Sequence, residues 1–139
     1  MDDKHLDVKV HYLAGAPELE QFDYGGCVDL YNYEDVDMRA GDWQLVNLGV
    51  SMQLPDGYDA LLLPRSSKRY GLLLANSVGY IDNSYAGDED VWMASVYATR
   101  DVHIDKGTRC FQFRIIPTQP KLSFTPVDRL KPKRRGGFG

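Results

Sequence analysis

Apolar and polar residues alternate with a period of two along much of the chain. Between Leu6 and Tyr12 every second residue is apolar, and Val46, Leu48 and Val50 follow the same rule. Such alternation predicts strands that bury one face. Further short apolar runs lie between turn signals at residues 60–63, 72–74, 78–81, 91–99, 109–116 and 121–127. Because no convincing amphipathic helix interrupts them, the pattern predicts an all-β sandwich, jelly roll or barrel.

The chain length and a composition shift near the C-terminus predict the domain organisation. A chain of 139 residues can enclose one full hydrophobic core and is too short for two ordinary domains. After Asp128 the sequence is rich in lysine and arginine and runs into Gly136-Gly137-Phe138-Gly139, which cannot form a core. We therefore predict a single β domain over residues 1–128 and a flexible basic tail over residues 129–139.

The overall charge limits the classes of partner. The formal net charge is −4, so the chain has no general attraction for nucleic acid or for an anionic membrane. Any bound anion must then be held by a local group of cations and donors. No apolar run is long enough to span a bilayer, and residues 1–5 lack the basic-then-apolar order of a secretory signal. These features predict a cytoplasmic protein.

The cysteine and histidine positions argue against a transition-metal site. Cys27 and Cys110 could pair, but their spacing indicates no disulfide framework, and we expect two reduced thiols. The three histidines form no H-x-x-H pattern and no cluster with cysteine. A zinc or iron ion held by protein ligands is therefore not expected.

The segment Pro64-Arg65-Ser66-Ser67 directly follows an apolar run. Two hydroxyls, backbone N–H groups and a guanidinium at the end of a strand could together bind a phosphate. Serine, proline and arginine are also common in turns. Taken alone, this tetrapeptide is more often an ordinary polar turn.

The segment Gly79-Tyr80-Ile81-Asp82-Asn83-Ser84-Tyr85 is typical of a tight hairpin that carries one carboxylate. Backbone groups at an opened hairpin tip could pair with the edge of a base, and Tyr85 could pack against a sugar. A plain Asp-Asn turn in a β protein is the commoner explanation.

Two further segments carry weak signals. Phe111, Phe113 and Ile115 share one face of a predicted strand and are expected in the core, so Gln112 lies on the opposite face. In the tail, arginines beside Phe138 could close over an anionic, planar ligand. For an isolated tail a frayed, solvated terminus is the commoner case.

The order of these segments along one chain is far more specific than any one of them. The sequence reads, in turn, Gly26-x-x-Asp29-Leu30, Pro64-Arg65-Ser66-Ser67, Gly79-Tyr80-Ile81-Asp82-x-x-Tyr85, Gly107-Thr108-Arg109-x-x-Gln112 and Gly136-Gly137-Phe138-Gly139. In this order the segments, which cover residues 25–139, resemble the five motifs of the trimeric dUTP pyrophosphatase (dUTPase) family, most closely its bacterial and phage members.

The resemblance implies a jelly-roll β domain that assembles as a homotrimer with shared active sites. It implies hydrolysis of dUTP to dUMP and pyrophosphate, which supplies dUMP and keeps uracil out of DNA. Mg²⁺ is the implied cofactor, held by Asp29 through water, in keeping with the preference of this ion for waters and phosphate oxygens.

The resemblance also implies roles for residues at the phosphates. Asp82 is expected to activate the water that attacks the α-phosphorus. Ser66, Ser67 and Gln112 are expected to contact the phosphate chain, and Arg65 belongs to the same motif and is expected to brace it between subunits. The phosphate contacts from the tail are expected from Arg134 and Arg135.

At the nucleoside, the resemblance implies that the backbone of the hairpin reads the uracil edge. The residues expected there are Asn76, Gly79, Tyr80 and Ile81. A closed hairpin leaves no room for the methyl group of thymine. Tyr85 is expected to stack under the deoxyribose and exclude a 2′-hydroxyl, and Phe138 to cover the uracil.

The chain departs from the family pattern at two places. Cys27-Val28 stand where the family usually has Gly-Tyr before the aspartate. In the last motif, Lys133 stands where the longer form of the motif has its arginine, whereas Arg135 fits a shorter phage form. We favour Arg135, with Arg134 next, for the γ-phosphate.

Three alternatives remain open from the sequence. dCTP deaminases share the fold and an Arg-Ser-Ser motif, but need a glutamate in the strand after the hairpin, where Val91-Trp92-Met93-Ala94-Ser95-Val96 has none. A regulatory binding protein would be expected to carry an inserted segment, and none separates the motifs. An arm for nucleic acid is disfavoured by the short tail and the acidic body.

Overall fold

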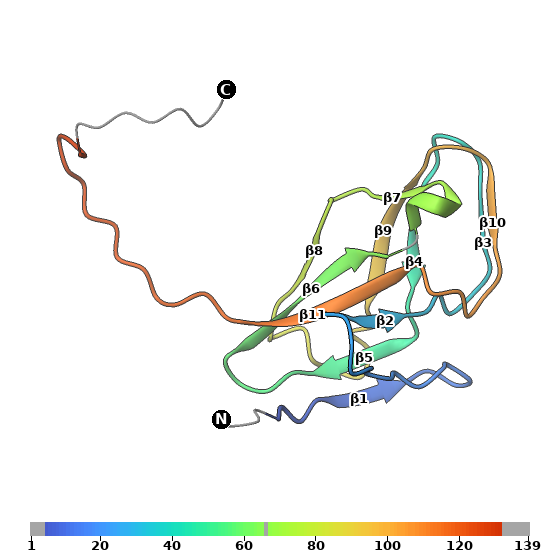
Figure 1. Ribbon diagram of the computed structural model, residues 1–139, viewed down its shortest axis with the longest axis horizontal. Helices are drawn as coiled ribbons and strands as arrows, with labels where there is room; N and C mark the ends of the chain where they lie inside the picture. Colours follow the sequence, from blue (N-terminus) through green and yellow to red (C-terminus); the bar gives the residue numbers. More distant parts are fainter. Residues whose placement is uncertain (1–4, 66, 132–139) are drawn as a thin grey trace.

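Strands and one short 3₁₀-helix make up the regular structure of the chain, for which the computed structural model describes residues 5–65 and 67–131 (Figure 1). No α-helix occurs within these residues, and none of their segments forms a helix long and apolar enough to cross a membrane. The elements are β1 (Lys9–Tyr12), β2 (Val28–Leu30), β3 (Val36–Met38), β4 (Trp43–Asn47), β5 (Val50–Gln53), β6 (Tyr58–Pro64), η1 (Ser67–Tyr70), β7 (Leu72–Leu74), β8 (Gly79–Ile81), β9 (Met93–Ala98), β10 (Val102–Ile104) and β11 (Phe111–Pro117).

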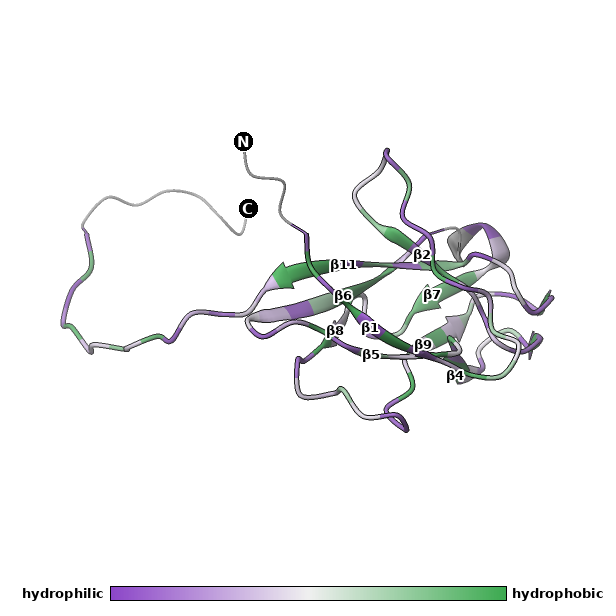
Figure 2. Cartoon of the chain, turned by 90° about the horizontal axis from the view of Figure 1, so that it is seen from below, coloured by the Kyte–Doolittle hydropathy of each residue, from purple (hydrophilic) through white to green (hydrophobic). Residues whose placement is uncertain are grey.

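Four antiparallel sheets form two layers around the core. The largest has the strand order β2-β11-β6-β8, and a three-stranded sheet has the order β4-β9-β7. Two pairs, β1-β5 and β10-β3, extend these layers. Seen from below, β2, β11 and β6 lie over β4, β5 and β9 (Figure 2). The structure therefore confirms the all-β, jelly-roll-like prediction.

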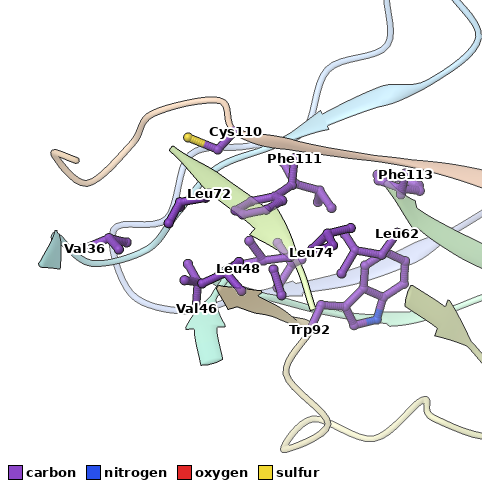
Figure 3. Packing of buried hydrophobic residues seen from close by; sticks show 14 of the residues in the cluster. Val36, Val46, Leu48, Leu62, Leu72, Leu74, Trp92, Cys110, Phe111 and Phe113 are labelled. Atoms are coloured by element: carbon purple, nitrogen blue, oxygen red, sulfur yellow. The ribbon is translucent and has the colours of Figure 1, made fainter. Parts of the chain in front are cut away.

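Alternating residues of both layers fill the space between them. On β11, Phe111 and Phe113 are buried, as their spacing predicts, and the ring of Trp92 meets Phe113 edge-on with centroids 5.3 Å apart (Figure 3). Leu62 from β6 and Leu74 from β7 join the same cluster. Truncating such a buried aromatic ring to alanine costs about 3–5 kcal/mol, so this cluster stabilises the strands that carry the site.

Two expectations about strands are wrong. The alternation over Val46, Leu48 and Val50 is divided between two strands, because Gly49 adopts a φ of 73° and turns the chain from β4 into β5. No strand forms over residues 121–127. After Pro117 the chain leaves the sheet, and residues 119–131 lie extended and exposed (Figure 1). Alternation alone does not make a strand where no neighbouring edge is available within the chain.

Candidate active site

The outer face of the four-stranded sheet brings two predicted site residues together. Gln112 of β11 lies between Asp29 of β2 and Leu63 of β6 in the strand register. Because Phe111 and Phe113 point into the core, the side chains at 29 and 112 point away from it. The amide of Gln112 donates from Nε2 to the carbonyl of Pro64 at 3.0 Å, which ties β11 to the end of β6.

Asp29 holds two guanidinium groups at one edge of this face. Arg65 Nε lies 2.8 Å from Asp29 Oδ1, and Arg109 Nη1 lies 3.5 Å from Asp29 Oδ2. Arg65 also donates from Nη1 to the carbonyl of Arg109 at 3.4 Å. Two cations around one anion leave a local positive charge in a chain whose net charge is −4. An anion bound by this acidic chain would need a local group of cations of this kind.

A hollow of about 370 Å³ opens beside these charges. Its wall includes Asp29, Arg65, Arg109 and Gln112 on one side and residues 22–27 on the other. In that loop Phe22 and Tyr24 stack with ring centroids 5.7 Å apart. The lining of the hollow therefore combines cationic and amide donors with aromatic side chains.

Two larger hollows lie elsewhere and lack this chemistry. One of about 710 Å³ is lined by residues 14–17, 32–35 and 106–107, where Lys106 lies beside Glu34 and Asp35. Another, of about 580 Å³, lies between the N-terminal segment with β1 and strands β2, β5 and β11, and its lining mixes apolar side chains with Asp7, Glu20 and Arg114. The volume of a hollow therefore does not identify the site. Neither of these two larger hollows is lined by two arginines that contact a predicted site residue.

The second part of the site is residues 79–85, for which the sequence predicts a tight hairpin. That prediction is wrong in one respect: among the described strands β8 pairs only with β6, and the chain after β8 turns and enters β9 in another sheet. The segment called the hairpin here is therefore an edge strand followed by a turn. Its Gly79 faces Leu62 of β6 so closely that a Cβ at position 79 would come within 2.9 Å of the Leu62 Cβ. Glycine is thus required here by close approach. Beyond β8 the amide of Tyr85 donates to the carbonyl of Asp82 at 3.0 Å and closes a turn.

Asp82 projects from this turn as an exposed carboxylate. The hydroxyl and the amide of Ser84 donate to Asp82 Oδ1 at 2.7 and 2.9 Å. These hydrogen bonds, the hydroxyl first, lower the pKa of Asp82 below its usual value, because both favour the charged form. Asp82 is therefore ionised near neutral pH and able to accept a proton.

The structure shows roles for three side chains near Asp82 that the sequence did not predict. Asp59 and Asn83 had no predicted role, and Tyr80 was expected to act only through its backbone. Asp59 of β6 is buried and accepts hydrogen bonds from the Tyr80 hydroxyl and, at 2.9 Å, from the Asn83 amide. The hydrogen bond to Asp59 is the main cause that raises the pKa of Tyr80. Asp59 sits within a run that looks like an ordinary turn and strand, so only the tertiary fold shows its partners.

The remaining predicted nucleoside residues flank the hairpin. Asn76 lies exposed in the turn between β7 and β8, next to Ser77, whose φ of 62° is unusual for a residue with a side chain. Tyr85 donates its hydroxyl to the carbonyl of Val91 at 2.8 Å, and partial burial is the main cause that raises its pKa. Ile81 lies half-buried beside the core.

The hairpin and the cationic hollow lie at opposite ends of β6. Asp59 is level with Asp82, one step beyond the paired residues Ala60 and Ile81, whereas Arg65 follows the other end of the strand. Six residues of strand span about 20 Å at roughly 3.3 Å per residue. Within one copy of the chain, these two groups are therefore not brought together.

Some predicted positions lie outside the described part of the chain. These are Ser66 and the tail residues Arg134, Arg135 and Phe138. Ser67 begins the 3₁₀-helix η1 directly after the cationic end of β6. Arg109, Phe22 and Tyr24 line the hollow without having been assigned a role, although Arg109 belongs to a motif that the sequence shows.

The described acidic side chains form no direct metal site. Among residues 5–65 and 67–131, no three histidine, cysteine or acidic side chains are grouped to ligate a metal directly. Asp29 is only 14% exposed, and both of its oxygens face guanidinium groups. Because both oxygens of Asp29 are engaged by arginine, a metal contact at this residue would run through water and not through direct ligation.

Comparison with known proteins relates this geometry to a family. The sequence model of the dUTPase family matches residues 25–139. A prophage-derived deoxyuridine 5'-triphosphate nucleotidohydrolase of Bacillus subtilis is 42% identical over 137 residues, which cover 96% of each chain. A relative of the same name from Cutibacterium acnes is 36% identical over 80% of this chain and 75% of its own length.

Solved structures agree with the fold. The crystal structure of dUTPase from Streptococcus mutans matches with a TM-score of 0.72 and 25% identity, over 82% of this chain and 98% of that one. A variant of the dUTPase from phage phi11 of S. aureus, a structure that describes the coordination of a structural Mg(II) ion, matches with a TM-score of 0.74 at 18% identity, over 90% and 99%. With these similarities, and with a family match over residues 25–139, the chain belongs to the dUTPase family.

Proposed function

We propose that this protein hydrolyses dUTP to dUMP and pyrophosphate by attack of water on the α-phosphorus. The observation that carries the proposal is the exposed, ionised carboxylate of Asp82 on the hairpin of a dUTPase-family chain. The B. subtilis and C. acnes relatives bear the name of this activity. The reaction would supply dUMP and lower the amount of dUTP available for incorporation into DNA.

The triphosphate binds at the hollow around Asp29. Arg65 and Arg109 supply the positive charge, and Gln112 supplies an amide on the same face. Ser66 and Ser67 follow Arg65 in sequence and contribute hydroxyl donors. Arg134 and Arg135 complete the phosphate contacts from the tail, Arg135 at the γ-phosphate. Charge-assisted donors of this type hold phosphate oxygens more strongly than neutral ones do.

Asp82 acts as general base on the attacking water. Its hydrogen bonds with Ser84 both fall on Oδ1, so Oδ2 is the oxygen that accepts the proton of the water. A positioned base contributes typically about 10²–10⁴-fold to the rate. Pyrophosphate leaves with charge that the guanidinium groups offset. No covalent intermediate is needed, since neither cysteine has a histidine beside it.

Magnesium fits the phosphate side of this site. Asp29 would hold the ion through water, while the oxygens of the triphosphate coordinate it directly. When bound, the ion supplies charge stabilisation to the phosphates. Arg65 and Arg109 keep Asp29 fixed for this contact through their ion pairs.

The hairpin selects the nucleoside. Backbone groups of Gly79, Tyr80 and Ile81, together with Asn76, pair with the uracil edge, and closure of the hairpin excludes a 5-methyl group. Tyr85 stacks under the deoxyribose, held by its hydrogen bond to the Val91 carbonyl. Phe138 covers the uracil from the tail.

The active site is shared between copies in a homotrimer. Support comes from the separation of about 20 Å between Asp82 and Arg65 along β6, at roughly 3.3 Å per strand residue. A base at the α-phosphorus and a cation on the same triphosphate cannot be that far apart. A hairpin from one copy and a cationic hollow from another satisfy both requirements.

Exposed apolar surface supports this association. On the outer face of β4-β9-β7, Trp43 is 63% exposed and lies opposite Tyr97, which is also paired with Leu73. Leu45 and Met93 are exposed on the same sheet. Past the last strand, Phe124 is 87% exposed. Contiguous apolar side chains of this kind are typical of surfaces that another chain covers.

Residues 129–139 act as a basic tail that closes over the bound nucleotide. The strands of the domain that holds the nucleotide lie within residues 9–117, and residues 119–128, which lie outside the sheets, join this domain to the tail. The enzyme would work in the cytoplasm of a bacterial or phage-infected cell, where dUTP arises. It needs neither nucleic acid nor a membrane for this reaction, and its substrate is a free nucleotide.

The first test is pyrophosphate release from dUTP, dTTP, UTP and dCTP by the purified protein, with and without Mg²⁺. We expect release from dUTP alone, increased by Mg²⁺. Ammonia release from dCTP would instead establish a deaminase. Release from none of the four, with dUTP binding retained in calorimetry, would establish a binding protein.

The second test is Asp82→Asn, which keeps the shape of the side chain and removes its basicity. Turnover of dUTP should fall by about 10²–10⁴-fold, while dUTP binding and the oligomeric state stay as in the wild type. Asp56→Asn, in the exposed turn before β6, is the matched control and should leave turnover unchanged. Near-wild-type turnover of Asp82→Asn would remove Asp82 as the base.

A further inference from the structure

A buried carboxylate lies beside the catalytic hairpin without belonging to any of the expected motifs. Asp59 on β6 is 4% exposed, and its position is level with Asp82 across the β6-β8 pair. A charge that is buried this deeply requires hydrogen-bond partners. Asp59 has two such partners, and both lie in the hairpin.

The two partners of Asp59 stand on either side of Asp82 in the sequence. The Tyr80 hydroxyl donates to Asp59 Oδ2, and the backbone amide of Asn83 donates to Asp59 Oδ1 at 2.9 Å. Because one donor precedes Asp82 and the other follows it, Asp59 restrains the chain on both sides of the catalytic residue.

Asn83 fastens the hairpin at a second place. Its side-chain amide donates from Nδ2 to the carbonyls of Pro55, at 2.9 Å, and Tyr58, at 2.8 Å. These carbonyls flank the turn that leads into β6. The hairpin is therefore held to β6 and its preceding turn by side-chain bonds, whereas the carboxylate of Asp82 accepts its hydrogen bonds locally, from Ser84.

This arrangement separates two tasks between two carboxylates. Asp82 remains exposed, where a water and the α-phosphate can reach it, and Asp59 is buried, where it accepts hydrogen bonds. Hydrogen bonds to an ionised acceptor are about twice as strong as neutral ones. The side chain of Tyr80 is directed to Asp59, so only the backbone at position 80 is left to pair with a base.

We propose that Asp59 is a positioning residue for the hydrolysis, which holds the hairpin through Tyr80 and Asn83 and so aligns Asp82 with the attacking water. The expected effect on kcat rests on the proposed function, whereas the expected effect on the mobility of the hairpin does not. A displacement of about 1 Å of a catalytic group can cost on the order of 10²-fold in rate. Loss of this anchor should accordingly lower turnover without removing any group that touches the substrate.

The kinetic test uses Asp59→Asn, which keeps the size of the side chain but places an NH₂ group where an acceptor faces a donor. We expect kcat for dUTP to fall at least about tenfold, with KM changed much less. Tyr80→Phe, which removes one hydroxyl, should lower kcat by a smaller factor. The double variant should be no slower than Asp59→Asn alone, because both changes break the same contact.

The matched control is Val36→Ala, a substitution in the buried core on β3, far from the hairpin in the sheet order. It lowers the melting temperature without touching the anchor and should leave kcat near the wild-type value. A kcat loss in Asp59→Asn no larger than in Val36→Ala would overturn the proposal. If Asp59→Asn does not fold, a wild-type kcat in both Tyr80→Phe and Asn83→Ala would overturn it equally.

Hydrogen exchange separates this inference from the proposed function. Amides of residues 82–85 should exchange faster in Asp59→Asn than in the wild type, while those of β4 and β9 stay protected. If the wild type released no pyrophosphate from dUTP, the proposed function would fail, and faster exchange would still support the anchor. Unchanged exchange at the hairpin would overturn the anchor whatever the activity.

Discussion

At the scale of single residues, three aspartates with the same side chain acquire different tasks from their surroundings. Asp29 lies between the guanidinium groups of Arg65 and Arg109. Asp59 is buried beneath Tyr80. Asp82 is exposed, and its carboxylate accepts hydrogen bonds from Ser84. The chemistry of a carboxylate is thus set by which donors reach it and by how much water remains.

The hydrogen bond from the Ser84 hydroxyl to Asp82 leads to a prediction about the pH dependence of kcat. This hydroxyl is the first cause of the lowered pKa of Asp82, so Ser84→Ala should raise that pKa towards its ordinary value. Since the protonated form cannot accept a proton from water, the acidic limb of the kcat profile should move to higher pH. Turnover at neutral pH should change little. The measurement is kcat for dUTP against pH, with Ser77→Ala as the control, and an unmoved acidic limb would contradict the prediction.

At the scale of elements, side-chain contacts add to the backbone pairing of the two short strands β3 and β10. The short strands β3 and β10 pair with Asp37 opposite His103. One ring nitrogen of His103 contacts Asp37, and the other lies 2.9 Å from Asp105. These two carboxylates, Asp37 first, raise the pKa of His103 to about 9. The pair is thereby held by a charged histidine over the neutral pH range.

The raised pKa of His103 leads to a prediction about how the melting temperature depends on pH. The folded-state pKa of His103 lies above its ordinary value of 6.5, so its stabilising contribution is full below about pH 6.5 and is lost as pH rises through about 9. The melting temperature of wild type should exceed that of His103→Gln at acidic and neutral pH, and the gap should close in alkaline buffer. His11→Gln, on the exposed edge of β1, serves as the control. A gap that stays constant across pH would contradict the prediction.

The same scale shows where sequence patterns succeed. The two faces of Phe111–Pro117 follow from alternation, because each side of a strand meets a different environment. The strand over Leu72–Leu74 follows from a short apolar run between turn signals. The split at Gly49 does not follow from it, since a turn within an apolar run leaves the period unchanged. The short strands β2, β3 and β10 have too few residues to show a period.

At the scale of the whole molecule, one copy keeps the proposed catalytic groups apart and exposes apolar surface. Asp82 and the arginines lie at opposite ends of β6. The outer face of β4-β9-β7 exposes Trp43, Tyr97 and their apolar neighbours. Association of copies would bury this surface and assemble the site in one step.

The exposed apolar face of β4-β9-β7 leads to a prediction about the oligomeric state. Tyr97→Asp places a charge among exposed apolar side chains, so it should leave one copy folded and weaken association. Sedimentation should show a shift from a species of three times 15.7 kDa towards a single copy, with activity lost in parallel. Gln53→Asp adds the same charge on an exposed position of β5 and should change neither. A trimer that persists in Tyr97→Asp would place the interface elsewhere.

The local sequence was sufficient for the strand-rich fold class, for the inward-facing side chains of β11 and for the turn that carries Asp82, but not for the pairing of β8, which has β6 and no following strand as its neighbour. These features depend on residues close together in the chain, whose spacing a periodic pattern records. The ordered motifs identified the family for the same reason, since each is a short contiguous segment.

Only the tertiary structure decided which distant residues meet. Asp29 contacts Arg65 and Arg109, and Asp59 receives hydrogen bonds from Tyr80 and Asn83, across separations that no local pattern encodes. It also decided that Asp82 lies a strand length from Arg65 within one copy. Such contacts arise from strand pairing and register, which are fixed by burial of the whole core and not by any single segment.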